Sequence, residues 1–136
     1  MKPVIQEEKT GCAIASSAAI AGISYSKAKR ITNDLGIYAD DSTLWSDTRP
    51  IRAILKELGF RAATTEAPFK DWASLPDRAL LAIKWHREEG KPYWHWVVFV
   101  RERGKEYVLD SKNTLKTNIR TDFGRMKPKW FIKVTG

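Results

Sequence analysis

Hydrophobic and polar positions follow two different periods along this chain. In the first half, apolar residues recur at helical spacing and are flanked by capping residues. The pattern predicts three helices, over residues 12–22, over 27–35 and from Asp47 or Thr48 to Leu58. We expect Gly22 to end the first helix and Ser26 to cap the second. A surface loop over 37–46 is expected between the second helix and the third.

The second half follows the shorter period of β-strands. Strands are predicted over residues 60–65, 79–85, 94–101, 106–111 and 129–135, with a short helical turn over 69–75. Gly90-Lys91-Pro92 and Arg103-Gly104 are typical of turns between neighbouring strands. Helices followed by an antiparallel sheet indicate an α+β fold. The length of 136 residues suits a single domain, residues 1–136.

The composition is that of a globular protein, 43% hydrophobic and 29% charged, with a formal net charge of +8. The positive charge is concentrated in residues 101–136, which hold ten Lys and Arg against four Asp and Glu. Such a surface attracts nucleic acid, anionic lipid or an acidic polypeptide, or it is simply a solvated face. Charge alone does not choose among these partners.

The uncharged stretch over residues 10–26 is rich in Ala, Ser and Gly, which predicts a buried helix and no membrane segment. The first residues lack the apolar core of a secretory signal. Cys12 is the only cysteine, so no internal disulfide is expected and a cytoplasmic location is the simplest. One cysteine and two histidines are too few for a typical zinc site, and no glycine-rich phosphate loop is present. We therefore expect no cofactor.

Four residues provide the groups of a cysteine acyl-transfer site. Cys12 opens the first predicted helix, where the helix N-terminus favours a thiolate and directs backbone N–H groups at an oxyanion. His95 opens a predicted strand and is the candidate general base and acid. Asp110 ends the next strand and is the candidate carboxylate that orients the imidazole. The side-chain amide of Gln6 is a candidate second donor to the oxyanion.

Strand register predicts that the imidazole and the carboxylate meet. If Arg103-Gly104 forms a two-residue turn, Glu102 pairs with Lys105, and Asp110 becomes the diagonal neighbour of His95. Diagonal neighbours on one face are about 7–8 Å apart at the backbone, within reach of a hydrogen bond between these two side chains. A register slip of one residue would place them on opposite faces.

Each of these residues also has an ordinary structural explanation. Cys12 alone would be a small buried hydrophobe, His95 a residue at a strand end, and Asp110 a turn residue. The only other histidine, His86, lies in a charged stretch and is expected to be exposed. Tryptophans surround the proposed histidine, and they predict either a wall of a substrate cleft or core packing: Trp85, Trp94 and Trp96.

The ordered motifs resemble those of papain-like cysteine peptidases, in particular the bacterial bacteriocin-processing branch that cleaves double-glycine leaders. They are Gln6-x5-Cys12 before a small-residue helix, then His95-Trp96-Val97-Val98 and Leu109-Asp110. The resemblance implies Cys12 as nucleophile, His95 as general base and then acid, Asp110 as orienting acid and Gln6 in the oxyanion hole. It also implies an N-terminal helical lobe packed on a C-terminal antiparallel sheet, with the site in the cleft between them.

We therefore expect a cysteine peptidase or amide hydrolase that acts on a peptide or protein substrate, an acidic one being favoured by the basic surface. A stand-alone peptidase, an amidase and a toxin-like hydrolase all stay open. The alternative from another class is a peptide-binding module that uses the same scaffold without cleavage. Nucleic-acid binding ranks last, because the chain has no recognised nucleic-acid motif.

Overall fold

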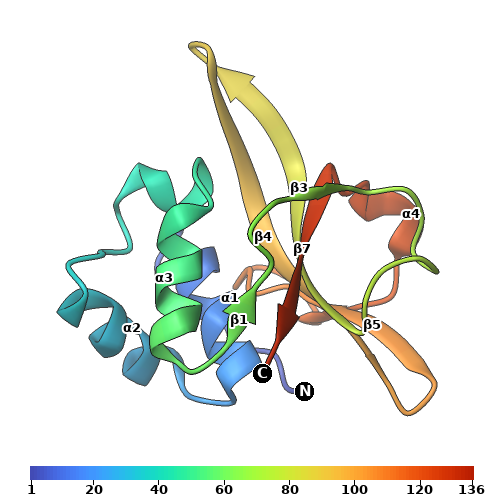
Figure 1. Ribbon diagram of the computed structural model, residues 1–136, viewed down its shortest axis with the longest axis horizontal. Coiled ribbons are helices and arrows are strands. Elements are labelled where there is room, and N and C mark those ends of the chain that lie inside the picture. The colour runs from blue at the N-terminus through green and yellow to red at the C-terminus, as the bar shows by residue number, and fades with distance from the viewer.

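Helices and one antiparallel sheet form separate layers in the computed structural model, which describes residues 1–136 (Figure 1). The helices are α1 (Cys12–Ala21), α2 (Tyr25–Asp34), α3 (Arg49–Glu57) and α4 (Phe123–Met126), with a 3-10 helix, η1 (Ser42–Trp45). The strands are β1 (Arg61–Ala62), β2 (Ala67–Pro68), β3 (Arg78–Glu88), β4 (Lys91–Glu102), β5 (Lys105–Leu109), β6 (Ile119–Arg120) and β7 (Trp130–Thr135). The fold is therefore α+β, as the sequence predicts.

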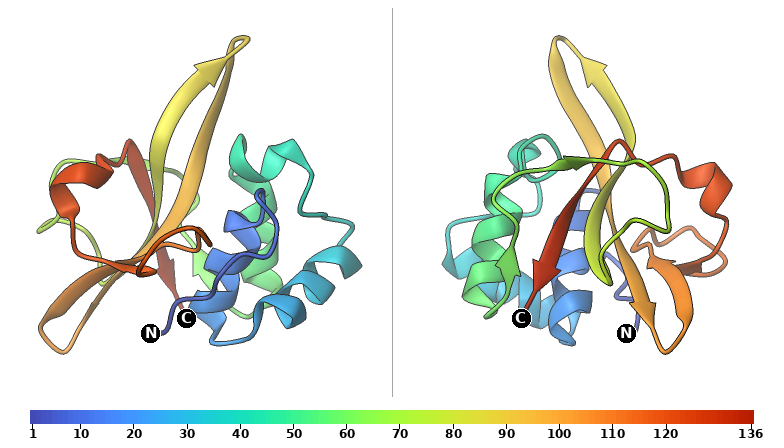
Figure 2. Two further views of the ribbon diagram at one scale, coloured as in Figure 1. Left: turned by 180° about the vertical axis from the view of Figure 1, so that it is seen from behind. Right: turned by 45° about the vertical axis from the view of Figure 1, so that its right-hand side comes forward.

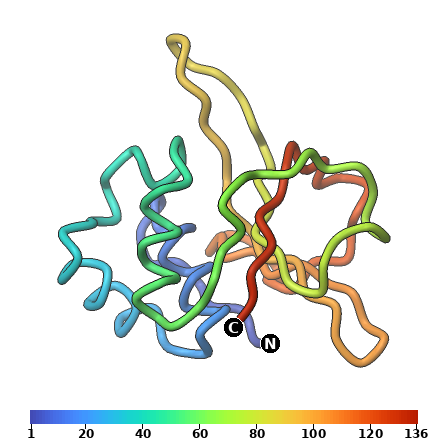
Figure 3. The backbone as a smooth tube through the Cα atoms, in the orientation of Figure 1, coloured from blue at the N-terminus to red at the C-terminus, as the bar shows by residue number.

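The seven strands form one antiparallel sheet in the order β1-β7-β3-β4-β5-β6, and β2 also pairs with β7. The long strands β3 and β4 form its centre, and their hairpin extends well beyond the rest of the molecule (Figure 1, Figure 3). The helices α1, α2 and α3 gather on one side of the sheet, and α4 lies on the other (Figure 2). The sheet thus has two covered faces.

The alternation of side chains along β4 separates two hydrophobic cores. Trp94, Trp96 and Val98 belong to the larger core, which includes residues of α1, η1 and α3. Val97 and Phe99 point the other way, into a smaller core. The position of His95 in this alternation places it on the face of the smaller core. That core is closed by α4 and by aromatic side chains packed on the sheet: Phe69, Trp72, Phe123 and Phe131.

Small residues let α1 sit deep between the sheet and α2. Nine of its ten residues are buried, from Cys12 to Ile20, because Ala and Ser side chains allow neighbouring elements to approach closely. Gly22 ends the helix in the left-handed conformation, with φ 69°, as expected. The expected cap of the next helix is wrong: Ser24, and not Ser26, accepts the hydrogen bond from the backbone N–H of Lys27.

The turn that sets the register of β4 and β5 has the predicted form. Arg103 and Gly104 both have positive φ, 53° and 75°, which is the twist required in a two-residue hairpin turn. Glu102 pairs with Lys105, and the ladder continues in this register to Val98 opposite Leu109. The β3–β4 turn is displaced from its expected place, because Lys91 and Pro92 lie in β4 and the positive φ values fall at residues 89–90.

Several local predictions differ from the structure. The strand expected over 60–65 is reduced to the two residues of β1, and 69–75 forms turns and bends in place of a helical turn. The short elements β2, β6 and α4 lie outside the predicted elements. None of the helices has both the length and the apolar character that crossing a bilayer requires.

Candidate active site

Cys12 occupies the first position of α1. No side chain caps this helix, and no acidic residue lies in its first turn. The first N–H groups of an α-helix have no partner inside the helix, so those of α1 keep their capacity to bind a negative charge. Cys12 is 5% exposed, in contact with the larger core.

The helix start lies against the edge of β4 near the histidine. Ser16, one turn further along α1, donates a hydrogen bond to the carbonyl oxygen of Trp96 at 3.5 Å. Strand β5 ends at Leu109, opposite Val98, so the part of β4 that contains His95 has no paired strand on that side. The imidazole can therefore reach the end of β5 and the start of α1 from the same edge of the sheet.

His95 and Asp110 form a direct hydrogen bond. The distance from His95 Nε2 to Asp110 Oδ1 is 2.8 Å, across the diagonal that the hairpin register predicts. Because Nε2 faces the carboxylate, Nδ1 is the ring nitrogen that remains for another partner. The side chain of Cys12 is the neighbour that interacts with the ring and favours its protonation. The structure thus brings Cys12, His95 and Asp110 together.

The carboxylate of Asp110 is 1% exposed and has three polar partners. Oδ1 also accepts the backbone N–H of Lys112 at 3.1 Å, and Oδ2 accepts from Arg120 Nη1 at 3.0 Å. Burial alone would raise the pKa of Asp110, but the hydrogen bond and charge of His95, with these other donors, lower it to about 2. The carboxylate is therefore ionised at neutral pH.

The ionised carboxylate in turn keeps a proton on the histidine. Burial lowers the pKa of His95, yet the hydrogen bond with Asp110 and the interaction with Cys12 outweigh it and raise the pKa to about 9. The ring side chain is 16% exposed, so solvent screens these interactions only in part. An imidazolium at neutral pH is the state that stabilises a neighbouring thiolate.

Gln6 is close to the site but is engaged in other hydrogen bonds. Its amide nitrogen donates to the backbone carbonyls of Glu8, at 2.9 Å, and Lys9, at 2.8 Å. Its side-chain oxygen accepts from the Ser111 hydroxyl at 2.7 Å, and its backbone N–H donates to the Ser111 carbonyl at 3.0 Å. Both amide hydrogens are therefore directed at backbone, and the observed role of Gln6 is to join the loop before Cys12 to the residue after Asp110.

The loop that leads into Cys12 is also fixed from the side of α2. Glu8 accepts hydrogen bonds from the Tyr25 hydroxyl and from the Lys29 ammonium. Burial and the hydrogen bond to Glu8 raise the pKa of Tyr25, so its hydroxyl remains a donor. A Cβ at Gly11 would come within 2.2 Å of the Tyr25 hydroxyl, which explains why glycine precedes the cysteine.

Arg120 is a site residue that the sequence analysis misses. Its guanidinium binds Asp110 through Nη1 and binds Asp122 through Nε, at 2.9 Å, and Nη2, at 2.7 Å. The residue reaches Asp110 because β6 pairs with β5, with Arg120 opposite Val108. A strand of two residues leaves no periodic pattern in the sequence, so no signal marked Arg120 in advance.

The tryptophans near His95 pack in the core. Trp94 and Trp96 are 6% and 0% exposed, and both rings stack edge-on against Trp130. The indole N–H of Trp96 donates to the carbonyl of Leu44 at 2.7 Å, which fixes η1 on the sheet. His86 is exposed, as expected. The predicted alternative of core packing is therefore confirmed for Trp94 and Trp96.

Five surface cavities of about 350–660 Å³ are lined by residues other than Cys12 and His95. No group of three or more His, Cys, Asp and Glu side chains is arranged to hold a metal ion. In comparisons with known proteins, no protein-family model and no curated protein sequence matches this chain.

Proposed function

We propose that this chain is a cysteine hydrolase of peptide-like amide bonds with a papain-like arrangement of catalytic groups. The proposal is supported above all by one observation: His95 binds Asp110 through Nε2 at 2.8 Å, and its imidazole also interacts with the side chain of Cys12. The helical layer packed on an antiparallel sheet, with the nucleophile at the start of α1, agrees with the resemblance in the sequence.

Before the reaction starts, the Cys12 thiol has given its proton to His95 Nδ1, and Asp110 stabilises the resulting imidazolium beside the thiolate. The thiolate attacks the substrate carbonyl carbon, and a C–S bond forms while negative charge collects on the carbonyl oxygen. Backbone N–H groups in the first turn of α1 stabilise that oxyanion. As the C–N bond breaks, His95 returns the proton to the leaving nitrogen.

In the second half, a water molecule resolves the thioester between Cys12 and the acyl group. His95 removes a proton from the water, whose oxygen attacks the same carbonyl carbon. The C–S bond then breaks, the carboxylic acid is released, and the sulfur regains its ion pair with His95. Gln6 would donate to the oxyanion only after releasing Glu8 or Lys9, so we assign it the positioning of the Cys12 loop.

Alkylation of the native protein by iodoacetamide, followed by mass spectrometry, tests the nucleophile. We expect Cys12 to react at pH 7 at least tenfold faster than it does in protein unfolded in urea, because the imidazolium favours the thiolate. His95→Ala should remove this advantage, whereas the exposed His86→Ala should retain it. A sulfur that reacts only after denaturant is added would contradict the proposal.

The second candidate is a peptide-binding module on the same scaffold. It is favoured by the burial of Cys12, 5% exposed, and by the engagement of both Gln6 amide hydrogens. This candidate requires a thiol of ordinary reactivity in the folded state. The alkylation experiment therefore separates the two functions without knowledge of the substrate.

A further inference from the structure

A cavity of about 620 Å³ opens next to the His95–Asp110 pair. It is connected to the pair through Arg120, which lines the cavity and binds Asp110. Basic side chains dominate its wall: Lys84, Lys116, Arg120 and Arg125. The acidic residue in the wall is Asp122, which Arg120 already binds. The cavity therefore has an excess of positive charge.

A break in the strand pairing directs Lys84 to this place. Ile83 pairs with His95, and the next pair is His86 with Tyr93, so the register shifts between Ile83 and His86. Lys84 lies in this bulge with φ 54°, a left-handed conformation that is costly for a residue with a Cβ. A bulge turns a side chain away from the regular alternation, and here it brings a lysine to the edge of the candidate site.

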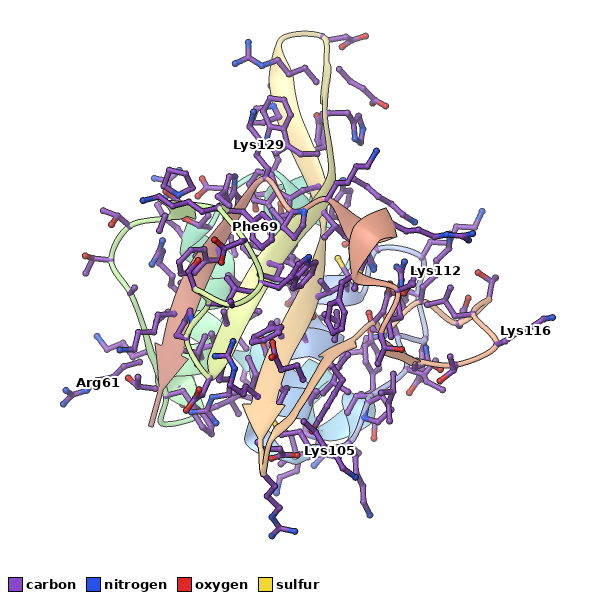
Figure 4. All side chains as sticks on the ribbon, turned by 90° about the vertical axis from the view of Figure 1, so that its right-hand side faces the viewer. Arg61, Phe69, Lys105, Lys112, Lys116 and Lys129 are labelled. Carbon is purple, nitrogen blue, oxygen red and sulfur yellow. The ribbon has the colours of Figure 1, made fainter.

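Apart from Arg120, the cations in the wall of this cavity form no ion pair within the protein. Partial desolvation and then the nearby ammonium of Lys112 lower the pKa of Lys84, so two like charges lie side by side. Neither lysine forms an ion pair, and the same holds for Lys116 and Arg125. Lys112 and Lys116 lie on the loop after β5, on the side of the molecule that Figure 4 presents.

We propose that Lys84, Lys116 and Arg125 in the wall of this cavity, together with Lys112 beside Lys84, form a cationic pocket that binds a carboxylate of an acidic peptide substrate. The proposal rests on the proposed function and names its substrate class. An anion between Lys84 and Lys112 would relieve the repulsion between their ammonium groups. Three of the free cations line one cavity instead of following a long track, which favours an acidic side chain over a nucleic-acid backbone. Arg120 is saturated by two carboxylates and orients Asp110.

Two alkylating reagents of nearly equal size test the cationic pocket. Iodoacetate carries a carboxylate, iodoacetamide is neutral, and both join a CH₂ carbon to the Cys12 sulfur with loss of iodide. The ratio of their rate constants reports the attraction of an anion to the site. We expect this ratio to fall roughly three- to fivefold in Lys84→Gln/Lys112→Gln, since two nearby charges are removed.

The matched control is Lys105→Gln, which removes a positive charge at the tip of the β4–β5 hairpin, far from Lys112 (Figure 4). It should leave the ratio within about 1.5-fold of wild type, because solvent and salt screen a remote exposed charge. Lys112→Gln alone is included because this residue lies in an exposed loop, so its loss does not endanger folding. An equal ratio in wild type and in the Lys84 and Lys112 variants overturns the cationic pocket and leaves the hydrolase proposal intact.

If Cys12 reacts with neither reagent, the hydrolase proposal is refuted, and the cationic pocket is then tested by a binding experiment. Cys12→Ala protein is titrated with acetyl-Glu-Glu-Glu-Glu-amide and with its Gln counterpart, and backbone amide shifts are followed by NMR. Preferential binding of the Glu peptide, weakened at least fivefold by Lys84→Gln/Lys112→Gln, supports the pocket. Equal binding of both peptides overturns it. Tighter binding of a single-stranded DNA 12-mer that depends on the same lysines also overturns it, because it identifies a different partner.

Discussion

Replacing Asp110 by Asn removes the charge that holds the proton on His95. The pKa of His95 is about 9 in the folded protein, against an ordinary value of 6.5, although burial acts in the opposite direction. In Asp110→Asn, burial remains, the main stabilising partner is lost, and the guanidinium of Arg120 loses one of its two carboxylates. We expect the pKa of His95 to fall by about 2 units, equivalent to about 3 kcal/mol of differential interaction.

The chain has two histidines, so the imidazole C–H signals in a two-dimensional NMR spectrum can be assigned with one variant, His86→Ala. A titration from pH 5 to pH 10 then follows His95 in wild type and in Asp110→Asn. The signal of the exposed His86 serves as an internal reference. A pKa of His95 that moves by less than about half a unit would refute the electrostatic account of the site.

The same pair predicts how stability depends on pH. The pKa of His95 is raised in the folded state, so its contribution is fully present below pH 6.5 and is lost as the pH rises through about 9. The pKa of Asp110 is lowered, so its contribution is present above pH 3.8 and is lost as the pH falls towards 2. Urea unfolding should therefore show the largest deficit of Asp110→Asn between about pH 4 and pH 6.5, and a smaller one at pH 10, where the ion pair of Asp110 with Arg120 remains.

Two further substitutions test the loop that positions Cys12. Gly11→Ala should destabilise the fold by about 1–3 kcal/mol in urea unfolding, because its Cβ would meet the Tyr25 hydroxyl. In the control Gly124→Ala, the added Cβ meets nothing within 4 Å, so we expect no such loss. If adding Tyr25→Phe to Gly11→Ala restores no stability, the contact with the hydroxyl is not the cause. Gln6→Glu keeps the size of the side chain but cannot donate to the two backbone carbonyls. We therefore expect the free energy of unfolding to fall by about 2–4 kcal/mol and the alkylation of Cys12 to slow. A folded variant in which Cys12 is alkylated at the wild-type rate would show that Gln6 does not position the loop.

The parts of the fold that local rules determine could be predicted from the sequence. The Arg103-Gly104 turn has the residues that a two-residue hairpin requires. Counting residue pairs back from this turn gives the register of β4 and β5, which predicts that His95 and Asp110 are diagonal neighbours. Gly22 ends α1 for a similarly local reason, its positive φ. The contact between Cys12 and His95 depends on how α1 packs on the sheet, so no spacing rule predicts it; the chemistry and chain order of the four candidate residues, and the resemblance to a known family, suggested it.

Features that depend on how the elements pack together could not be predicted from local sequence rules. Ser24 and Ser26 are both suitable caps, and burial of Tyr25 in the first turn of α2 decides for Ser24. Residues 69–75 are predicted to form a helical turn, but they form a loop from which Phe69 and Trp72 pack on the sheet. Apolar side chains that pack from a loop follow no regular spacing, so the sequence pattern could not identify it. The role of Arg120 follows from β6, which exists only through its pairing with β5.

The two hairpin ends differ in what they can accommodate. An insertion between Glu102 and Lys105 that shifted the pairing by one residue would exchange the two sides of β5 and turn the carboxylate of Asp110 away from His95, without altering any side chain. The Glu89-Gly90 end projects into solvent far from the helices (Figure 1), and lengthening it disturbs no pairing near Cys12. Natural length variation should therefore collect at residues 89–90, and this tip is the place to graft an epitope or a fluorescent label.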